Sequence, residues 1–268
     1  MVLLWLSIAL AAPSHGLDKL LAELGDVPPG PQRILRASQL LLGRPYELHP
    51  LGEGAGRDPK PRLRLDAFDC QTYVETALAL GEARSVAETR AALDDIRYAG
   101  VPSFAERNHF MMSQWVPSNE AKGYLASEGA AAATVEKVVT AKSWRGRSCQ
   151  SIALPPERIP IGTFRLPLTT LDQLLAQAPR IPDGTLMLVV RDDRPSFPDR
   201  VTHLGFVVQR DGHTFFRHAS DVFERVVDER LEHFVNRNRR YAYAVSGVSL
   251  LSLRDNSARV QSLCVPPP

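Results

Sequence analysis

The first hundred residues carry hydrophobic side chains at the spacing of amphipathic helices. Apolar residues recur every three or four positions, and Gly and Pro interrupt the pattern. This pattern predicts helices at residues 17–24, 32–42, 69–81 and 85–98. In the third helix, Asp69 is expected to be the N-cap and Gly81 the stop. Ser85 and Glu88 form a capping-box pattern at the start of the fourth helix.

The last third of the chain has the shorter periodicity and the turn residues of β-structure. Strands are predicted at residues 185–190, 201–209 and 213–219, with one or two more within 241–253. Asp211-Gly212 is a strong signal for a two-residue hairpin turn. A short helix begins at Thr170, whereas residues 121–150 show no clear pattern and receive no role. Helices followed by an antiparallel sheet make the predicted fold class α+β.

Composition bounds the class of protein without pointing to a partner. The 268 residues are 44% hydrophobic and 23% charged, which is ordinary for a chain that buries a sizeable core. The formal net charge of +2 gives no electrostatic reason to expect nucleic-acid or anionic-membrane binding. The simplest organisation is a single domain with inserted segments, and the oligomeric state does not follow from the sequence.

The N-terminal run MVLLWLSIALAA, residues 1–12, is apolar but too short to span a bilayer. It resembles a signal-peptide core, with small residues at positions 9–11, although no Lys or Arg precedes it. We therefore expect residues 1–16 to be a signal peptide, residues 17–268 to be the folded domain, and the protein to be periplasmic or secreted. A buried N-terminal helix is the alternative. We expect no stable membrane insertion elsewhere.

Cys70 lies at the predicted start of the third helix. Free N–H groups and the helix dipole favour a thiolate there, which would make this cysteine a nucleophile. The alternative is a small buried hydrophobic residue. The other two cysteines, Cys149 and Cys264, either form a disulfide in an oxidising compartment or remain unpaired thiols.

Two histidines are expected on one face of the predicted hairpin. With Asp211-Gly212 as the turn, His203 lies opposite Ser220, two positions along the strand from His218. The two imidazoles are then diagonal neighbours that can meet. A thiol and two imidazoles suit a cysteine hydrolase, in which one ring moves the proton and the second orients the first.

Other interpretations of the same residues stay open at this point. Each histidine can be a hydrogen-bonded core or strand residue. Cys70, His203 and His218 can also form a three-ligand zinc site, but the chain contains no closely spaced metal-binding motif that supports one. We therefore predict no metal site.

Longer motifs around these residues resemble the NlpC family of papain-like cell-wall cysteine peptidases. The first set is Asp69-Cys70, His203-Leu204-Gly205-Phe206-Val207 and His218-Ala219-Ser220. The resemblance is closer to a branch of N-acetylmuramoyl-L-alanine amidases. The motifs of that branch are Gly43-Arg44-Pro45-Tyr46, Leu51-Gly52-Glu53-Gly54, residues 69–75, and Arg107-Asn108-His109-Phe110 leading to Trp115.

The resemblance implies a papain-like fold and a role for each matching residue. It makes Cys70 the nucleophile, His203 the base and His218 the orienting residue, with no cofactor. Tyr46 matches a tyrosine that donates to the oxyanion, which is a role suited to a phenol. A packing role for Tyr46 is the alternative.

The same resemblance suggests residues for binding the sugar. An aromatic face with amide, guanidinium and imidazole donors suits a muramyl group. The candidates are Arg107, Asn108, His109 and Trp115, and the alternative is that this cluster belongs to the core and surface. Asp69 either caps the helix or also contacts substrate. Glu75 is either a surface charge or a buried partner of an arginine.

The implied activity is hydrolysis of the amide bond between N-acetylmuramic acid and L-alanine in peptidoglycan fragments, through an acyl-enzyme. One alternative is a D-glutamyl-diamino acid endopeptidase that uses the same residues on muropeptides. Another is a non-catalytic glycan-binding module with the same fold. The sequence leaves open whether intact wall or released anhydro-muropeptides are preferred.

Overall fold

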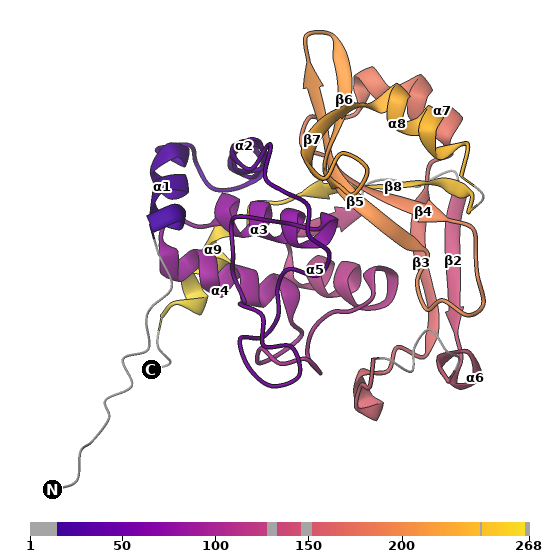
Figure 1. Ribbon diagram of the computed structural model, residues 1–268, viewed down its shortest axis with the longest axis horizontal. Coiled ribbons are helices and arrows are strands. Elements are labelled where there is room, and N and C mark those ends of the chain that lie inside the picture. Colours follow the sequence, from indigo (N-terminus) through magenta and orange to yellow (C-terminus); the bar gives the residue numbers. More distant parts are fainter. Residues whose placement is uncertain (1–14, 128–132, 146–151, 242, 266–268) are drawn as a thin grey trace, which may run out of the picture.

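The computed structural model describes residues 15–127, 133–145, 152–241 and 243–265. Residues 1–14 of the predicted signal peptide and Cys149 lie outside the described residues. Helices gather in the N-terminal half and strands in the C-terminal half, which confirms the α+β class (Figure 1). The α-helices are α1 (His15–Leu24), α2 (Pro31–Leu40), α3 (Cys70–Glu82), α4 (Val86–Arg97), α5 (Val116–Lys122), α6 (Ala141–Trp144), α7 (Leu171–Gln177), α8 (Leu231–Asn238) and α9 (Ser257–Leu263).

The strands form a six-stranded antiparallel sheet in the order β1-β8-β4-β5-β6-β7 and a separate antiparallel pair, β2-β3. Short turns of other helix types are η1 (Met111–Trp115), η2 (Pro156–Arg158) and η3 (Ala178–Arg180). The strands are β1 (Leu125–Ser127), β2 (Ala133–Val139), β3 (Gly162–Leu168), β4 (Leu186–Arg191), β5 (Val201–Arg210), β6 (His213–Ser220), β7 (Arg225–Arg230) and β8 (Val245–Leu253).

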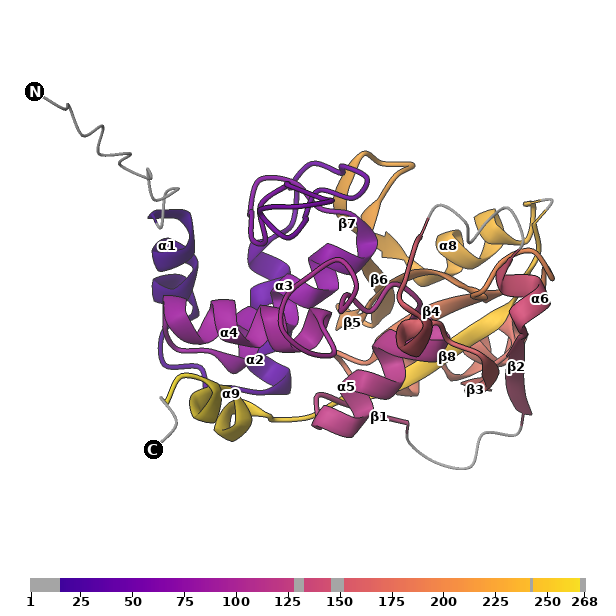
Figure 2. The same cartoon turned by 90° about the horizontal axis from the view of Figure 1, so that it is seen from below.

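The large sheet is covered on both faces (Figures 1 and 2). One face packs against α3, which α2 and α4 flank, and the other carries α7 and α8. Strand β4 shows the consequence, because Leu186 and Leu188 belong to the core beneath the helices. Met187 and Val189 belong to the second core on the opposite face. A strand buried on both faces needs an unbroken apolar sequence, which is the pattern that predicted β4.

Helix α3 is the central element of the helical half. Asp69 is its N-cap, as predicted, and accepts a hydrogen bond from the Thr72 backbone N–H at 2.8 Å. Gly81, by contrast, does not end the helix but lies within it. A Cβ on Gly81 would come within 2.2 Å of Ile34 Cγ1 and 2.5 Å of Ile34 Cα. The glycine is therefore needed for close packing of α2 on α3 rather than for a turn.

The sequence did not predict several elements, and polar residues at buried positions explain two of these omissions. In β2, Lys137 occupies an inward position and is only 2% exposed, because its ammonium pairs with Asp193. In β7, Glu229 is likewise buried. Helices α8 and α9 were also missed, and residues 241–253 supply one strand, β8. At α4, Ser85 caps as predicted, but Glu88 accepts from Arg84 N instead of completing the capping box.

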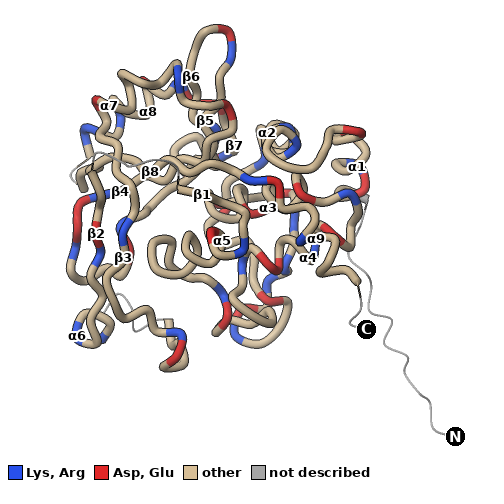
Figure 3. The backbone as a smooth tube through the Cα atoms, turned by 180° about the vertical axis from the view of Figure 1, so that it is seen from behind, with Lys and Arg blue, Asp and Glu red and all other residues tan. Residues whose placement is uncertain are grey.

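Charge is spread over the whole fold. Figure 3 shows basic and acidic residues interleaved along both the helical and the sheet halves. Within the described ranges, no helix combines the length and apolar character that a bilayer crossing requires.

Replacing Gly81 tests the close packing of α2 on α3. We expect Gly81→Ala to lower the free energy of unfolding by about 1–3 kcal/mol, because the added methyl group would overlap the Ile34 backbone. This loss should exceed the gain of about 1 kcal/mol in helix propensity. Gly100→Ala is the control, because its Cβ would meet only the side chain of Glu106, at 3.3 Å. Urea unfolding measures both, and equal stabilities would contradict the packing role.

Candidate active site

Cys70 is the first residue of α3, and a network around Asp69 holds that helix start in place. The Asp69 Oδ1 atom accepts from the backbone N–H and the hydroxyl of Thr72, both at 2.8 Å. Its Oδ2 atom accepts from the backbone N–H of His49 at 3.1 Å. Asp69 thus ties the helix start to the loop that precedes it. The cysteine has no disulfide partner and its side chain is partly exposed.

The sulfur reaches the strand that carries His203. The backbone N–H of Leu204, the next residue in β5, donates a hydrogen bond to Cys70. Burial, followed by the negative charge of Asp69, raises the pKa of the Cys70 thiol to about 12. Hydrogen bonds from the N–H groups of Leu204, Gln71 and Cys70 itself lower this pKa by less. The N–H groups at the helix start therefore favour the thiolate, as expected, but burial and the charge of Asp69 outweigh them.

The hairpin has the predicted turn and register. Asp211 and Gly212 have φ values of +52° and +72°, and Arg210 pairs with His213. The β5–β6 ladder ends, however, at the pair Phe206–Arg217. Beyond that pair the ladder is not continued, so the N–H of Leu204 is available to the sulfur rather than to β6.

The two predicted histidines are in contact beyond the end of this ladder. His203 Nε2 and His218 Nδ1 lie 2.6 Å apart, with the rings nearly perpendicular at 89°. Phe216 and Phe234 pack against both rings, which places the pair on the α8 side of the sheet. The second nitrogen of His218, Nε2, lies 3.3 Å from Glu229 Oε2.

Burial controls the protonation of both histidines. It lowers the pKa of His203 well below the usual value, and the positive charges of His218, Arg237 and Arg191 add to the effect. It also lowers the pKa of His218, against the opposing hydrogen bond to Glu229. Both imidazoles are therefore neutral at pH 7, and one of them can accept a proton.

Tyr46 lies beside the thiol. Its backbone pairs with Phe68, two residues before Cys70, and its N–H donates to Glu224 O at 2.9 Å. Burial, followed by the negative charges of Cys70 and Asp69, raises the pKa of the phenol. Tyr46 therefore remains protonated and can act as a hydrogen-bond donor.

A cavity of about 420 Å³ opens beside the start of α3 and contains four of the five predicted substrate-binding residues. Those four are Asp69, Arg107, Asn108 and His109. Arg107 is held by Glu53 and by Asp58, the latter at 2.9 Å, so it also organises the loop over the cavity. Gly52 of that loop is necessary, because a Cβ there would lie 2.4 Å from Asp58 O.

The fifth predicted residue, Trp115, does not line this cavity. Its side chain is 0% exposed, and its indole N–H donates to Glu75 at 2.9 Å. The prediction that Trp115 stacks on a sugar is therefore wrong, because neither ring face is open. Glu75 is the buried partner of an arginine, Arg97, at 3.1 Å. The aromatic residue in the cavity lining is Phe104, which the sequence did not single out.

His109 forms the wall of the cavity next to Phe104. Its Nε2 atom lies 2.7 Å from the Phe104 carbonyl oxygen, and the two rings are 4.7 Å apart. Burial lowers the pKa of His109 to about 4, so the ring is neutral and donates to that carbonyl. His49 also lines this cavity.

A second cavity, of about 470 Å³, lies beside the two histidines. It is lined by both His203 and His218, together with residues of β4 and α8 such as Arg191 and Arg237. Asp69 and Gln71, which flank Cys70 in the sequence, line the first cavity. His203, which precedes the hydrogen-bond partner Leu204, lines the second. Cys70 itself is in the lining of neither cavity.

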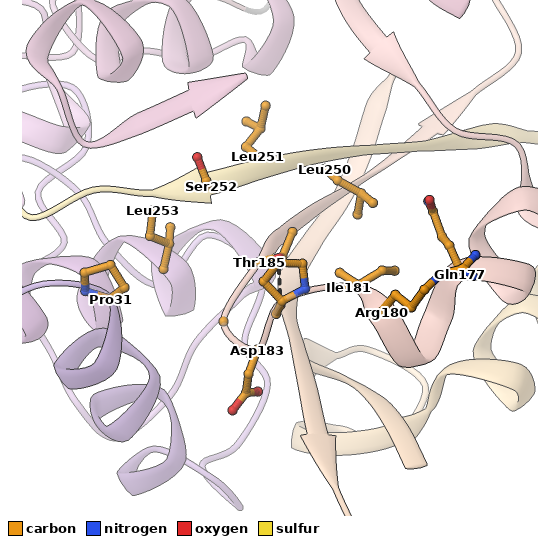
Figure 4. Close-up of a pocket in the computed structure, with 12 residues that line it drawn as sticks. Pro31, Gln177, Arg180, Ile181, Asp183, Thr185, Leu250, Leu251, Ser252 and Leu253 are labelled. Atoms are coloured by element: carbon orange, nitrogen blue, oxygen red, sulfur yellow. Dashed lines mark hydrogen bonds between the residues drawn. The ribbon is translucent and has the colours of Figure 1, made fainter. Parts of the chain in front are cut away.

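A third hollow is separate from these residues. A groove of about 430 Å³ lies between the start of α2, the turn before β4 and the end of β8. Figure 4 shows the residues that line it. Pro31, Ile181 and Leu251 line it, and none of the predicted site residues does. Among the residues that the structure describes, no three His, Cys, Asp or Glu side chains are grouped to hold a metal ion.

The comparisons with known proteins agree on a family and a fold. A model of the AmiA-like family, described as N-acetylmuramoyl-L-alanine amidase-like, matches residues 36–242. No curated protein matches the chain in sequence.

Two solved structures share the fold. A protein from Legionella pneumophila is 24% identical with a TM-score of 0.78, and the alignment covers 90% of this chain and 94% of that one. An N-acetylmuramoyl-L-alanine amidase from Bacteroides uniformis is 20% identical with a TM-score of 0.69, covering 84% of this chain and 98% of that one. At these identities the likeness concerns the fold alone.

The raised pKa of the thiol predicts slow alkylation of Cys70 in the free protein. At pH 7 we expect iodoacetamide to modify Cys70 more slowly than the exposed Cys264, because only the thiolate reacts. Between pH 6 and 9 the rate at Cys70 should rise without reaching a plateau. Peptide mass spectrometry of one sample compares the two residues, so Cys264 is an internal control. A faster Cys70 with a plateau below pH 7 would indicate a resting thiolate–imidazolium pair instead.

Proposed function

The chain belongs to the N-acetylmuramoyl-L-alanine amidase-like family, and from this premise we propose that it is a cysteine amidase acting on peptidoglycan fragments. The bond hydrolysed is the amide between the lactyl group of N-acetylmuramic acid and L-alanine. One observation carries the proposal. A free thiol at a capped helix start is hydrogen-bonded to the residue that follows His203, whose ring contacts His218.

In the proposed first half-reaction, His203 takes the thiol proton as the sulfur attacks the amide carbonyl carbon. The nitrogen that takes the proton is Nδ1, because Nε2 is engaged with His218. The C–N bond then breaks, and the imidazolium returns the proton to the departing L-alanine amine. The product is a thioester between Cys70 and the lactyl carbonyl.

In the second half-reaction, water replaces the amine. Neutral His203 removes a proton from the water as its oxygen attacks the thioester carbonyl. The C–S bond breaks and the sulfur regains a proton, which leaves the carboxylic acid of the muramyl group and a free enzyme. No redox step and no cofactor enter this balance.

The buried, neutral resting state suits this mechanism. Desolvating an uncharged thiol and an uncharged imidazole costs little free energy. The tetrahedral intermediate, by contrast, concentrates negative charge on one oxygen. The backbone N–H of Cys70 and the phenol of Tyr46 are the donors that we assign to that oxygen. In the described part of the chain, the Tyr46 hydroxyl has no hydrogen-bond partner, which leaves it available for the substrate.

The two cavities give the substrate a direction. The departing amine must leave beside His203, so the peptide belongs in the cavity that His203 lines. The muramyl group then occupies the other cavity, where Asn108, His109 and Phe104 offer polar groups and an aromatic face. Arg107 supports this wall through Glu53 and Asp58.

Replacing the sulfur tests the proposed nucleophile. We expect Cys70→Ser to reduce turnover of purified muropeptides by a factor of about 10³ or more, with an unchanged unfolding temperature. Mass spectrometry of the wild-type digest should show the intact stem peptide with a free L-alanine amine. Cys264→Ser, on the exposed thiol, should keep normal activity. Cleavage after D-glutamate would instead identify an endopeptidase, and binding without turnover would identify a glycan-binding module.

Removing the phenol hydroxyl tests the oxyanion donor. Tyr46→Phe should lower kcat by about 10²- to 10³-fold with little change in KM, because this donor acts mainly in the transition state. Tyr124→Phe is a matched control, because its hydroxyl donates to Asp95 at 2.9 Å and contacts no proposed catalytic residue. A normal kcat for Tyr46→Phe would assign Tyr46 to packing.

A further inference from the structure

A chain of hydrogen bonds continues beyond the two histidines into an ion pair between the buried Glu229 and the partly exposed Arg237. His218 Nε2 lies 3.3 Å from Glu229 Oε2, and Arg237 donates to the same oxygen at 2.7 Å. Arg237 also donates through Nε to the other oxygen, Oε1, at 3.2 Å. Glu229 is 7% exposed and His218 is 1% exposed. Strand β7 supplies the carboxylate and helix α8 the guanidinium, so three elements meet behind the imidazoles.

The donors and acceptors in this chain allow one arrangement of protons. Burial raises the pKa of Glu229, but the hydrogen bonds from His218 and Arg237 lower it by more, so the carboxylate is ionised. An ionised carboxylate only accepts hydrogen bonds, and His218 Nε2 must therefore carry a proton. A neutral His218 then has a bare Nδ1, which must accept the proton on His203 Nε2. The remaining nitrogen of His203, Nδ1, is left with a free lone pair.

We propose that Glu229, balanced by Arg237, is a positioning residue that sets the tautomers of both imidazoles and thereby keeps Nδ1 of His203 basic. The role rests on the amidase mechanism proposed above, in which Nδ1 takes the thiol proton. Without the carboxylate, His218 can place its proton on Nδ1 and donate to His203 Nε2. His203 would then hold its own proton on Nδ1 and could not act as the base.

Arg237 has a second part in the same device. A lone buried carboxylate beside His218 would stabilise an imidazolium, and a protonated His218 would donate from both nitrogens. His203 would then be forced into the wrong tautomer. Arg237 offsets the carboxylate charge and lowers the pKa of both histidines. The other charged groups that face the two rings are Arg191 from β4 and Asp221 after β6.

The tautomers can be observed directly in the resting protein. In the full chain labelled with ¹⁵N-histidine, two-bond ¹H–¹⁵N correlations at pH 7 should show both His203 and His218 neutral and protonated at Nε2. Single His→Gln variants assign the signals. The proposal is overturned if wild-type His218 is protonated at Nδ1 or on both nitrogens. This measurement requires no substrate, so it is decided even if the protein proves not to be an amidase.

Kinetics test the consequence for catalysis. Glu229→Leu should lower kcat at least about 10-fold with little change in KM and should shift His203 toward the Nδ1–H form. Glu229→Gln retains a carbonyl acceptor for His218 and should recover most of that loss. Arg237→Gln should move the acid limb of the kcat/KM profile to higher pH, because His218 then protonates more easily.

Two neighbouring residues provide matched controls. Asp228→Asn removes a buried partner of Arg217 one position away in β7, and Arg239→Gln removes an ion pair just after α8. Both should leave the tautomers and the acid limb unchanged. A normal kcat for Glu229→Leu with wild-type tautomers would overturn the proposal, as would an unmoved acid limb in Arg237→Gln. Absence of turnover in the wild type, with the expected tautomers, would refute the amidase assignment alone.

Discussion

The site depends on one junction, where the start of α3 contacts β5 beside the end of the β5–β6 ladder. The capping bonds of Asp69 fix the first turn of the helix, and the N–H of Leu204 fixes the sulfur to β5. A continuous ladder would have used that N–H within the sheet, and it would not have been available to the sulfur. The end of the ladder at Phe206–Arg217 is therefore as much a part of the site as the side chains are.

Burial at this junction disfavours the charged forms of both Cys70 and His203. The same desolvation that raises the pKa of Cys70 lowers that of His203, so the pair rests without charge. In the proposed mechanism, charge separation is then confined to the moment when the amide carbonyl is present to accept it. An environment that favours the charged pair at rest would stabilise the ground state along with the transition state, and would gain less in rate.

The sequence predicted the local features of the site better than its surroundings. The cap at Asp69, the turn at Asp211-Gly212 and the meeting of His203 with His218 follow from residue types and a period of two. Trp115 was misassigned because an aromatic residue in a polar motif looks the same whether buried or open. Its burial depends on packing between distant segments, and its partner Glu75 is 40 residues away.

Polar residues at inward positions of strands account for the other omissions. Lys137 and Glu229 interrupt the alternation that identifies a strand, and their partners Asp193 and Arg237 are not paired with them by any sequence pattern. The prediction that Gly81 ends the helix was wrong for a related reason. A glycine required by close packing against Ile34 cannot be distinguished in the sequence from a glycine required by a turn. Sequence periodicity shows which face of a strand is apolar. It does not show which polar residues on that face are stabilised by a partner from a distant segment.

The ion pair between the buried Glu229 and the partly exposed Arg237 is hard to explain by stability alone. Well-packed apolar residues in place of a buried ion pair are often as stable or more so, because two charges must be desolvated. The pair is set against a histidine whose neighbour has one free ring nitrogen, and apolar residues there would satisfy the packing while leaving His218 free to take either tautomer. An orienting requirement explains why a carboxylate stands at this position, and the need to keep His218 neutral explains why the carboxylate is paired with an arginine. The charges of Glu229 and Arg237 therefore lie where they control the position of the histidine protons rather than where they add stability.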